Sequence, residues 1–158
     1  MDPIVFSPIA VVHSPYTQIA GMPIQTVAAQ GVAGTVVVDS AYAPGLKDID
    51  GFSHLWLVVY LHRIEGYALE VTPFMDDKPH GIFATRSPRR PNPIGLSLVR
   101  LLSVEGNTLH IEDVDLLDGT PVLDIKPVLK GFLPRGVLRE PKWASEIMHE
   151  YWRAEPKE

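Results

Sequence analysis

The sequence contains no cysteine, which excludes disulfide bridges, thiolate metal ligands and a cysteine nucleophile. It also has no long hydrophobic run. The longest strongly apolar run, LWLVVYL at residues 55–61, is far shorter than the roughly 20 residues of a membrane-spanning helix. The N-terminal sequence MDPIVFSPIAVV lacks the basic start and small-residue cleavage site of a signal peptide. We therefore expect a cytoplasmic protein without a membrane partner.

Several common enzyme signatures are missing as well. The sequence has no glycine-rich dinucleotide fingerprint, no phosphate-binding loop of the G-x-x-x-x-G-K-[ST] type, no G-x-S-x-G elbow and no H-E-x-x-H helix. His54 and His62 lie on one expected strand but about 26 Å apart by strand rise, so they cannot share a metal ion. We expect no metal site.

The charge is acidic overall but unevenly distributed. The formal net charge is −5, which argues against a protein that coats nucleic acid without specificity. Only three of the fourteen Lys and Arg residues precede Arg86, whereas nine lie between Arg86 and Lys142. An anionic partner is therefore expected to bind the second half of the chain.

Length and composition indicate one globular domain over residues 1–158. Short runs of Val, Ile and Leu, bounded by Gly, Pro and Asp, predict β-strands. These strands are expected at residues 4–12, 31–39, 52–62, 68–74, 81–84, 96–104, 108–114 and 122–126. Gly106 and Asn107 form a two-residue hairpin signal between two of them.

Helical signals are few. Residues 40–51 are expected to contain one helical turn, and only EPKWASEIMHEYW at residues 140–152 is typical of a helix. Its aromatic and apolar face comprises Trp143, Ile147, Met148, Tyr151 and Trp152, and we interpret it as core or dimer contact rather than a base-stacking platform. The expected fold is mainly β: a single-sheeted barrel of short strands with a C-terminal helix.

The segment ATRSPRRPNPIGLS at residues 84–97 combines positive charge with a stiff backbone. Its three prolines fix their own φ angles and restrict the residues before them. We interpret it as a rigid loop whose arginines bind a carboxylate or phosphate, with Asn92 offering both a donor and an acceptor. Two alternatives stay open, namely a solvated surface loop and a P-x-x-P ligand for a partner protein.

The segment LLDGTPVLDIKP at residues 116–127 carries a second polar pattern. Asp118 and Gly119 predict a tight turn, and strand alternation places Asp124 and Lys126 on one face. The alternative interpretation is a plain hairpin turn with an exposed ion pair, which contributes little to stability.

Taken together, four blocks resemble one family. PIAVVHSPY, DGFSHLWLVVYLHR, GIFATRSPRRPNPIGLSLVRL and LDGTPVLDIKPVL are similar, in order, to the signature blocks of the S-adenosylmethionine-dependent tRNA N6-adenosine methyltransferases that act beside the anticodon. The resemblance covers residues 9–128. It implies a β-barrel that pairs as a homodimer, with the cofactor near the subunit interface.

The implied reaction transfers the methyl group of S-adenosylmethionine to N6 of threonylcarbamoyl-modified adenosine at position 37 of tRNA. Two alternatives remain: a non-catalytic barrel that binds S-adenosylmethionine or RNA, and the same chemistry on another substrate. The sequence departs from the family at IQTVAAQG (residues 24–31), at Val128, where an aromatic residue is frequent, and in lacking the C-terminal domain of longer relatives.

The resemblance also implies roles for individual residues. Arg89 and Arg90 are expected to face tRNA phosphate. The expected cofactor contacts are Gln25, Thr26, Val27, His62, Arg63, Arg86, Leu96, Asp118, Gly119, Thr120 and Pro121. We further expect the arginine loop and the Asp118 turn to enclose one cofactor.

The attacking N6 amine needs a hydrogen-bond acceptor, because its lone pair is delocalised into the adenine ring. Asn92 and Asp124 are the two candidates, with Asp124 slightly preferred and Lys126 expected to hold it ionised. His13 is interpreted as a structural residue at a strand end, with a substrate contact as the alternative.

Overall fold

The structure is a computed structural model that describes residues 2–23, 28–73 and 76–145. Its contacts form two compact units. The barrel unit consists of Met1–His62 and Ile94–Val128, and the second unit consists of Arg63–Pro93 and Leu129–Glu158. The expectation of a single domain over residues 1–158 stays a prediction.

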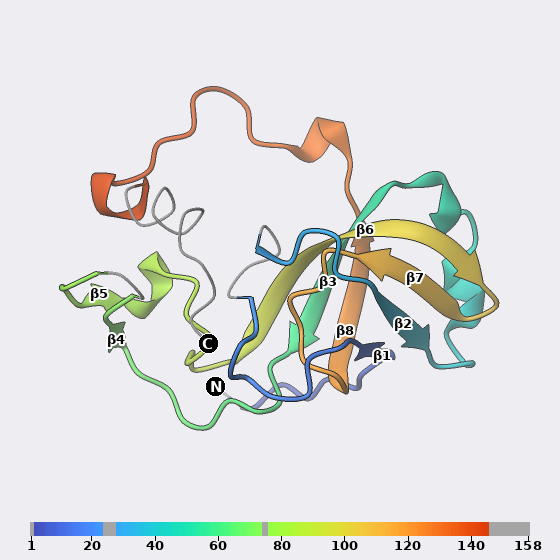
Figure 1. The fold of residues 1–158 in the computed structure, drawn as a ribbon, viewed down its shortest axis with the longest axis horizontal. Helices are drawn as coiled ribbons and strands as arrows, with labels where there is room; N and C mark the ends of the chain where they lie inside the picture. The colour runs from blue at the N-terminus through green and yellow to red at the C-terminus, as the bar shows by residue number, and fades with distance from the viewer. Residues whose placement is uncertain (1, 24–27, 74–75, 146–158) are drawn as a thin grey trace. The chain divides into compact units, whose positions relative to one another are not determined.

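Six antiparallel strands close into a barrel in the order β1-β2-β7-β6-β3-β8 (Figure 1). They are β1 Ala10–His13, β2 Gly34–Val38, β3 His54–Tyr60, β6 Ile94–Glu105, β7 Thr108–Glu112 and β8 Thr120–Pro127. All six overlap strands expected from hydrophobic patterning. The expected mainly β fold with a barrel is therefore confirmed.

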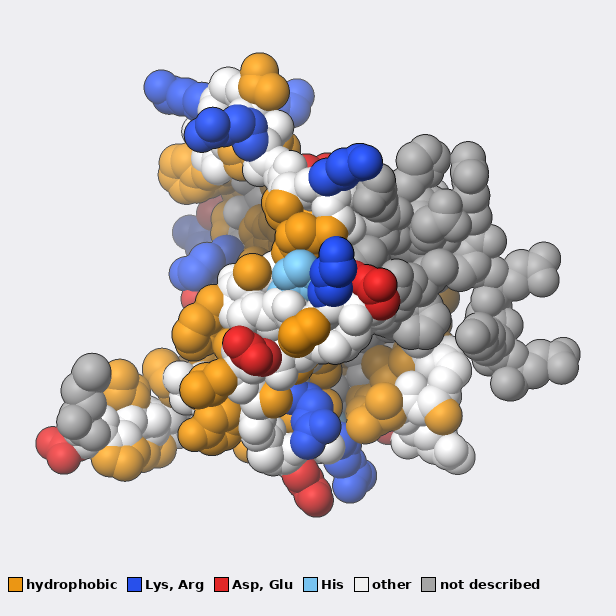
Figure 2. Space-filling model, turned by 90° about the vertical axis from the view of Figure 1, so that its left-hand side faces the viewer, with side chains coloured by type: hydrophobic (Ala, Val, Ile, Leu, Met, Phe, Trp, Pro, Cys, Tyr) orange, Lys and Arg blue, Asp and Glu red, His pale blue; other side chains and the backbone are white. Residues whose placement is uncertain are grey.

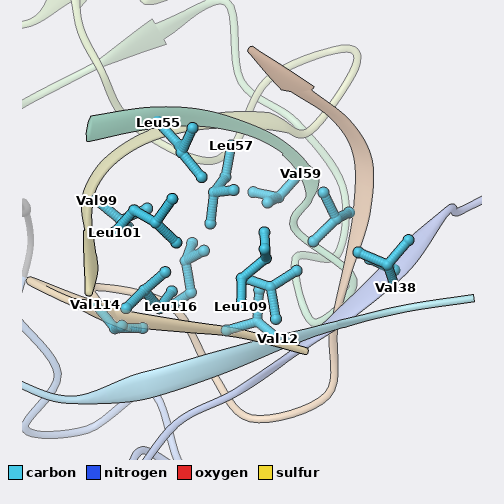
Figure 3. Close-up of a cluster of buried hydrophobic side chains, with 14 residues drawn as sticks. Val12, Val38, Leu55, Leu57, Val59, Val99, Leu101, Leu109, Val114 and Leu116 are labelled. Carbon is cyan, nitrogen blue, oxygen red and sulfur yellow. The ribbon is translucent and has the colours of Figure 1, made fainter. Parts of the chain in front are cut away.

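Alternation along the strands builds the core, because every second side chain points into the barrel. Leu55, Leu57 and Val59 of β3 are fully buried, and they meet Val99 and Leu109 from other strands (Figure 3). Val114 and Leu116, from the segment between β7 and β8, join the same cluster. That segment therefore contributes to the core as well as connecting two strands.

The hairpin between β6 and β7 forms where the sequence predicts it. Gly106 has φ +61°, a conformation that glycine adopts readily, and Asn107 follows it. Two hydrogen bonds connect Asn107 to Val38: the Asn107 Nδ2 donates to Val38 O at 2.5 Å, and the Val38 N–H donates to Asn107 O at 2.9 Å. The turn is thereby attached to the end of β2.

A β-bulge in β8 sets the direction of its later side chains. Val58 pairs with Asp124 and Val59 pairs with Val122, which leaves Leu123 as the extra residue. After the bulge, Ile125 packs against the core, so Asp124 lies on the outer face. Lys126, two residues later, shares that face, as strand alternation predicts.

Three strand expectations are only partly met. Of the described residues in the strand expected at residues 68–74, only Glu70–Val71 form a strand, β4. Residues 4–9 precede β1, and Ile4, Val5 and Phe6 are exposed. Backbone pairing reaches only as far as Ile9, whose N–H donates to Val122 O at 2.8 Å and whose O accepts the Asp39 N–H at 2.9 Å. The expected strand at residues 81–84 is instead the end of β5 followed by a 3-10 turn.

Short helices follow β2 in the barrel unit, at η2 Ala43–Leu46 and η3 Ile49–Gly51, which confirms the helical turn expected at residues 40–51. The second unit contains a two-stranded sheet, β4 Glu70–Val71 with β5 His80–Gly81, and the 3-10 turns η4 Ile82–Ala84 and η5 Lys130–Phe132.

The expected C-terminal helix is helical over residues 142–145. The rest of it, including Ile147, Met148, Tyr151 and Trp152, lies outside the described residues. Among the residues described, no helix has the length and apolar character that crossing a membrane requires.

Replacing Gly34 with alanine is expected to destabilise the barrel by about 1–3 kcal/mol. An added Cβ would lie 2.7 Å from the backbone oxygen of His13 and 2.9 Å from Val114 Cγ2, so β1 itself must move. Urea unfolding followed by tryptophan fluorescence measures the change. Gly51→Ala is the matched control, since a Cβ there meets no described atom within 4 Å. Equal changes in the two variants would contradict this reasoning.

Candidate functional site

Hydrogen bonds to backbone oxygens of Val12 and Leu117 hold the DGTP turn at residues 118–121. Gly119 has φ +77°, which favours glycine, and its N–H donates to Val12 O at 2.9 Å. The Thr120 hydroxyl is buried and donates to Leu117 O at 2.7 Å. The tight turn expected at Asp118 and Gly119 is present.

The HSPY segment at residues 13–16 packs against this turn. His13 Nδ1 lies 3.1 Å from Asp118 Oδ1, and the Ser14 backbone N–H donates to the same oxygen at 3.3 Å. In return, the Asp118 N–H donates to Tyr16 O at 2.8 Å. The Ser14 hydroxyl donates to Leu116 O at 2.6 Å. We call this set of contacts the Asp118 clamp; it fixes the carboxylate while leaving 44% of the side chain exposed.

Three of the predicted site residues lie on the outer wall of the barrel. They are Leu96, Asp124 and Pro121. Leu96 on β6 and Asp124 on β8 both pair with Val58 of β3, which lies between them, so Leu96, Val58 and Asp124 form one row across three neighbouring strands. Leu96 is 48% exposed. Pro121 pairs with the exposed Val11 of β1, one strand further round the barrel. The wall therefore offers an apolar surface with a carboxylate on it.

Asp124 carries the polar chemistry of this wall. Its Oδ2 lies 2.7 Å from Lys126 Nζ, and its Oδ1 accepts the Ile125 N–H at 2.9 Å. The side chains of Asp124 and Lys126 are 46% and 65% exposed. The pairing expected between these two residues is present, whereas the catalytic role of Asp124 stays a prediction.

A cavity of about 400 Å³ opens beside Asp124. Its wall comes from the start of β1, the end of β2, the η2–η3 segment and the middle of β8. The lining residues are Ile9, Val38, Ala41, Tyr42, Pro44, Gly45, Leu46, Ile49, Asp124 and Ile125. Sequence reasoning missed Tyr42; the available signal was an aromatic residue inside the proline- and glycine-containing turn SAYAPG.

In the second unit, Arg90 holds the arginine loop together from within. Its Nη1 donates to the backbone oxygens of Thr85 at 2.8 Å, Ile82 at 3.1 Å and Ser87 at 3.4 Å. Its guanidinium carbon also lies 5.8 Å from the centre of the Phe83 ring. Because the carbonyls of Thr85 and Ser87 flank Arg86, Arg90 fixes the backbone that presents the Arg86 side chain.

The remaining predicted site residues are distributed over both units. Arg63, Arg86, Arg89 and Asn92 are exposed in the second unit. His62 follows β3 in the barrel unit, where its N–H donates to Tyr60 O at 2.9 Å. Gln25, Thr26 and Val27 lie outside the described residues. Their roles, and the joint enclosure of a cofactor by loop and turn, stay predictions.

The second unit also contains a partly buried Asp–His–Trp stack. His80 Nε2 lies 2.9 Å from Asp76 Oδ2, and the His80 ring stacks on Trp143 with centroids 3.9 Å apart. Desolvation raises the pKa of Asp76, but hydrogen bonds from His80 and from the N–H groups of Lys78 and Asp77 together lower it, and the net shift is downward. The carboxylate is thus stabilised in its charged form.

The Asp76 contacts are expected to stabilise the protein only where the carboxyl is ionised. A pKa lowered on folding contributes stability above the ordinary value of 3.8, and this contribution disappears as pH falls through the folded pKa. The difference in melting temperature between the wild type and Asp76→Asn should therefore be largest near neutral pH and should become small at acidic pH. Asp50→Asn, at an exposed position, is the control; a gap that is constant with pH would contradict the assignment.

Exposed hydrophobic side chains occur together with cations on the molecular surface. Phe83, Phe132, Val137 and Leu138 of the second unit are exposed. Figure 2 shows one face on which hydrophobic side chains and Lys or Arg side chains are both exposed. No group of three His, Asp or Glu side chains that would suit a metal ion occurs within residues 2–23, 28–73 and 76–145.

Comparison with known families identifies the family of this chain. The family model described as the tRNA-methyltransferase O N-terminal domain matches residues 11–132, which include the whole barrel from Val11 through β8 and the arginine loop. The chain belongs to this family. The TrmO family model thus covers both the Asp118 clamp and the outer wall around Asp124.

Individual relatives agree with the family model. A "probable S-adenosyl-L-methionine-binding protein" of Pyrococcus abyssi is 46% identical over 151 residues, covering 96% of this chain and 82% of that protein. A "tRNA (adenine(37)-N6)-methyltransferase" of Mus musculus is 41% identical over 90 residues, covering 55% of this chain and 21% of that protein.

A solved structure supports the same fold. The crystal structure of TrmO from P. aeruginosa matches with a TM-score of 0.74 and 32% sequence identity, covering 90% of this chain. The chain spans 62% of the length of that TrmO chain. The family resemblance expected from the four sequence blocks is confirmed.

Proposed function

We propose that this protein is an S-adenosylmethionine-dependent methyltransferase that methylates N6 of adenosine 37 in tRNA, with threonylcarbamoyl-modified adenosine as the substrate. The observation that carries the proposal is the match of the TrmO family model to residues 11–132. The names of relatives add support, since they include both S-adenosylmethionine-binding proteins and a tRNA adenine-37 methyltransferase.

The side chains at the predicted cofactor positions fit the chemistry of this ligand. The half-exposed carboxylate of Asp118 suits a hydroxyl or ammonium donor, and exposed Leu96 suits an apolar or ring surface. Arg63 and Arg86 offer guanidinium groups that suit the carboxylate of an amino acid. His62, Gly119, Thr120 and Pro121 are proposed as further contacts, together with Gln25, Thr26 and Val27.

When bound, S-adenosylmethionine supplies a methyl group on a positively charged sulfur. The protein's task is to align the amine and accept its proton, because the N6 lone pair forms the new N–C bond while the S–C electron pair stays on sulfur. Asp124, paired with Lys126 at 2.7 Å, is the proposed acceptor of the N6 proton, and Asn92 is the alternative. Arg89 and Arg90 are proposed to contact tRNA phosphate.

We also propose that the protein acts as a homodimer. This proposal is supported by the outer face of β3 and β6, where Tyr60, Ile94 and Leu96 are exposed at neighbouring positions. Exposed apolar groups that lie together frequently mark contact surfaces between proteins. Light scattering on the purified chain gives its mass directly, and a monomer at micromolar concentrations would reject the dimer.

Transfer of labelled methyl from S-adenosylmethionine to tRNA tests the function. We expect threonylcarbamoyl-modified tRNA to be labelled at adenosine 37, with unmodified tRNA labelled poorly. If both tRNAs were labelled to the same extent, the proposed preference for threonylcarbamoyl-modified adenosine would be wrong, whereas the proposed methyl transfer to N6 would stand. A second candidate, cofactor binding without turnover, is favoured by the names of the relatives described as S-adenosylmethionine-binding proteins. Tight cofactor binding with no labelled RNA would support it.

Replacing His13 with alanine is expected to weaken cofactor binding roughly 2- to 10-fold, because one hydrogen bond to Asp118 is lost. His13 acts through Asp118 in this proposal. The double variant His13→Ala with Asp118→Ala should therefore bind as Asp118→Ala does. Calorimetry with S-adenosylhomocysteine measures all three variants, and strictly additive losses would show that His13 acts independently of the Asp118 clamp.

A further inference from the structure

The cavity beside Asp124 is built on a rigid segment. The Tyr42 N–H donates to Asp39 O at 2.8 Å, and the Gly45 N–H donates to Tyr42 O at 2.9 Å, so both peptide groups of Tyr42 are fixed. Asp39 Oδ1 also accepts the Ala41 N–H at 2.8 Å. Leu46 packs against the core below. The backbone of Tyr42 is thus held in place at the cavity, and the residue is 47% exposed.

The lining restricts the chemistry of an occupant. Ile9, Val38 and Leu46 provide apolar walls, and Tyr42 provides an aromatic face, so a flat ring system is favoured. The one carboxylate in the lining belongs to Asp124, and a carboxylate accepts hydrogen bonds and donates none. A fitting ligand therefore combines an aromatic ring with an N–H donor.

The charge next to the cavity disfavours other occupants. Lys126 neutralises Asp124 at 2.7 Å, so the pair attracts neither a free cation nor a phosphate strongly. A volume of about 400 Å³ accepts one purine ring system. An unpaired nucleobase with an exocyclic amine satisfies all three conditions: the ring, the donor and the absence of net charge.

We propose that this cavity is the binding site for the target adenine base, with Tyr42 as its stacking platform and Asp124 as the acceptor for its amine. The inference rests on the proposed function, which it extends by assigning the substrate base to a cavity that contains none of the predicted cofactor contacts. In this proposal Tyr42 is a substrate-binding residue. Asp124 accepts a hydrogen bond from the amine of the base and then accepts the proton that the amine loses.

The test is a titration of the ¹⁵N-labelled protein with adenosine in the presence of saturating S-adenosylhomocysteine, which occupies the cofactor site. We expect the backbone amides of residues 41–46 and 124–125 to shift. Purine riboside, the same ring without the amine, should bind more weakly to the wild type. Asp124→Ala should bind the two nucleosides equally, since the acceptor of the amine is gone.

The stacking role is tested by Tyr42→Leu, with Tyr67→Leu as the matched control at another exposed tyrosine. Loss of base–aromatic stacking is expected to weaken adenosine binding roughly 5- to 100-fold in Tyr42→Leu and to leave the control at wild-type affinity. Equal affinities in the two variants would overturn the proposal. Because Tyr42 is exposed, both variants are expected to keep the wild-type melting temperature.

The outcomes separate this inference from the proposed function. If S-adenosylhomocysteine binds but adenosine leaves the amides of residues 41–46 unchanged, the base site is wrong and the cofactor site stands. If S-adenosylhomocysteine itself occupies the cavity and excludes adenosine, the cavity belongs to the cofactor and the proposal is also wrong. If S-adenosylhomocysteine does not bind at all, the proposed function fails, and adenosine alone still decides the cavity.

Discussion

Replacing Asp124 with asparagine is expected to slow methyl transfer to N6 by roughly 100-fold or more, the usual scale for loss of a positioned proton acceptor. Asparagine keeps the size of the side chain but cannot take up the amine proton. Cofactor affinity should be unchanged, because Asp124 lies apart from the DGTP turn along β8. Single-turnover transfer of labelled methyl to modified tRNA measures the rate of the chemical step.

Asn92→Ala is the necessary comparison for this experiment. A large loss in Asn92→Ala with a wild-type rate in Asp124→Asn would assign the acceptor to the arginine loop instead. Lys126→Gln should produce a smaller loss than Asp124→Asn, because it removes the ion-pair partner of the carboxylate but leaves the acceptor itself. Wild-type rates in all three variants would show that solvent takes the proton.

Replacing Arg86 with alanine is expected to weaken S-adenosylmethionine binding roughly 10- to 100-fold, because a charge-assisted hydrogen bond contributes about 1.5–3 kcal/mol. The backbone on both sides of Arg86 is already fixed, since Arg90 binds the carbonyls of Thr85 and Ser87. Its guanidinium therefore loses less entropy on binding than one on an unconstrained loop. Calorimetry with the cofactor measures the change.

Arg135→Ala is the matched control, because it removes the same charge from an exposed position of the second unit outside the arginine loop. A similar loss of cofactor affinity in both variants would show that the effect of Arg86→Ala comes from the lost positive charge and not from a specific contact. Wild-type affinity in Arg86→Ala would remove Arg86 from the site. Arg90→Ala is expected to act differently: it frees three backbone carbonyls, so the loop itself should loosen.

The strands were predictable because their signal is local. Short runs rich in Val, Leu and Ile at residues 54–60 and 94–105 favour extended backbone, whatever strand lies beside them. The Gly106–Asn107 hairpin was equally predictable, since the turn conformation depends on two adjacent residues. The family followed from four blocks of residues that keep their order, which the match over residues 11–132 confirms.

Other features depended on neighbours that are distant in the chain. Residues 4–8 have strand-forming composition, yet a strand needs partners, and the backbone pairing with the β2 and β8 sides reaches only as far as Ile9. The internal contacts of Arg90 were not predictable either, because nothing in the sequence reveals that Ile82, Thr85 and Ser87 turn their carbonyls toward one guanidinium. Such contacts form only when a loop closes on itself.

By itself, the sequence determined the barrel class, the family and the identity of the charged and turn-forming residues, since each of these depends on composition and short-range spacing. Tertiary structure decided which of them meet. His13 reaches Asp118 across 105 residues, and Tyr42 lines the same cavity as Asp124. Strand pairing and the β8 bulge bring these groups together, and no spacing rule along the chain encodes that geometry.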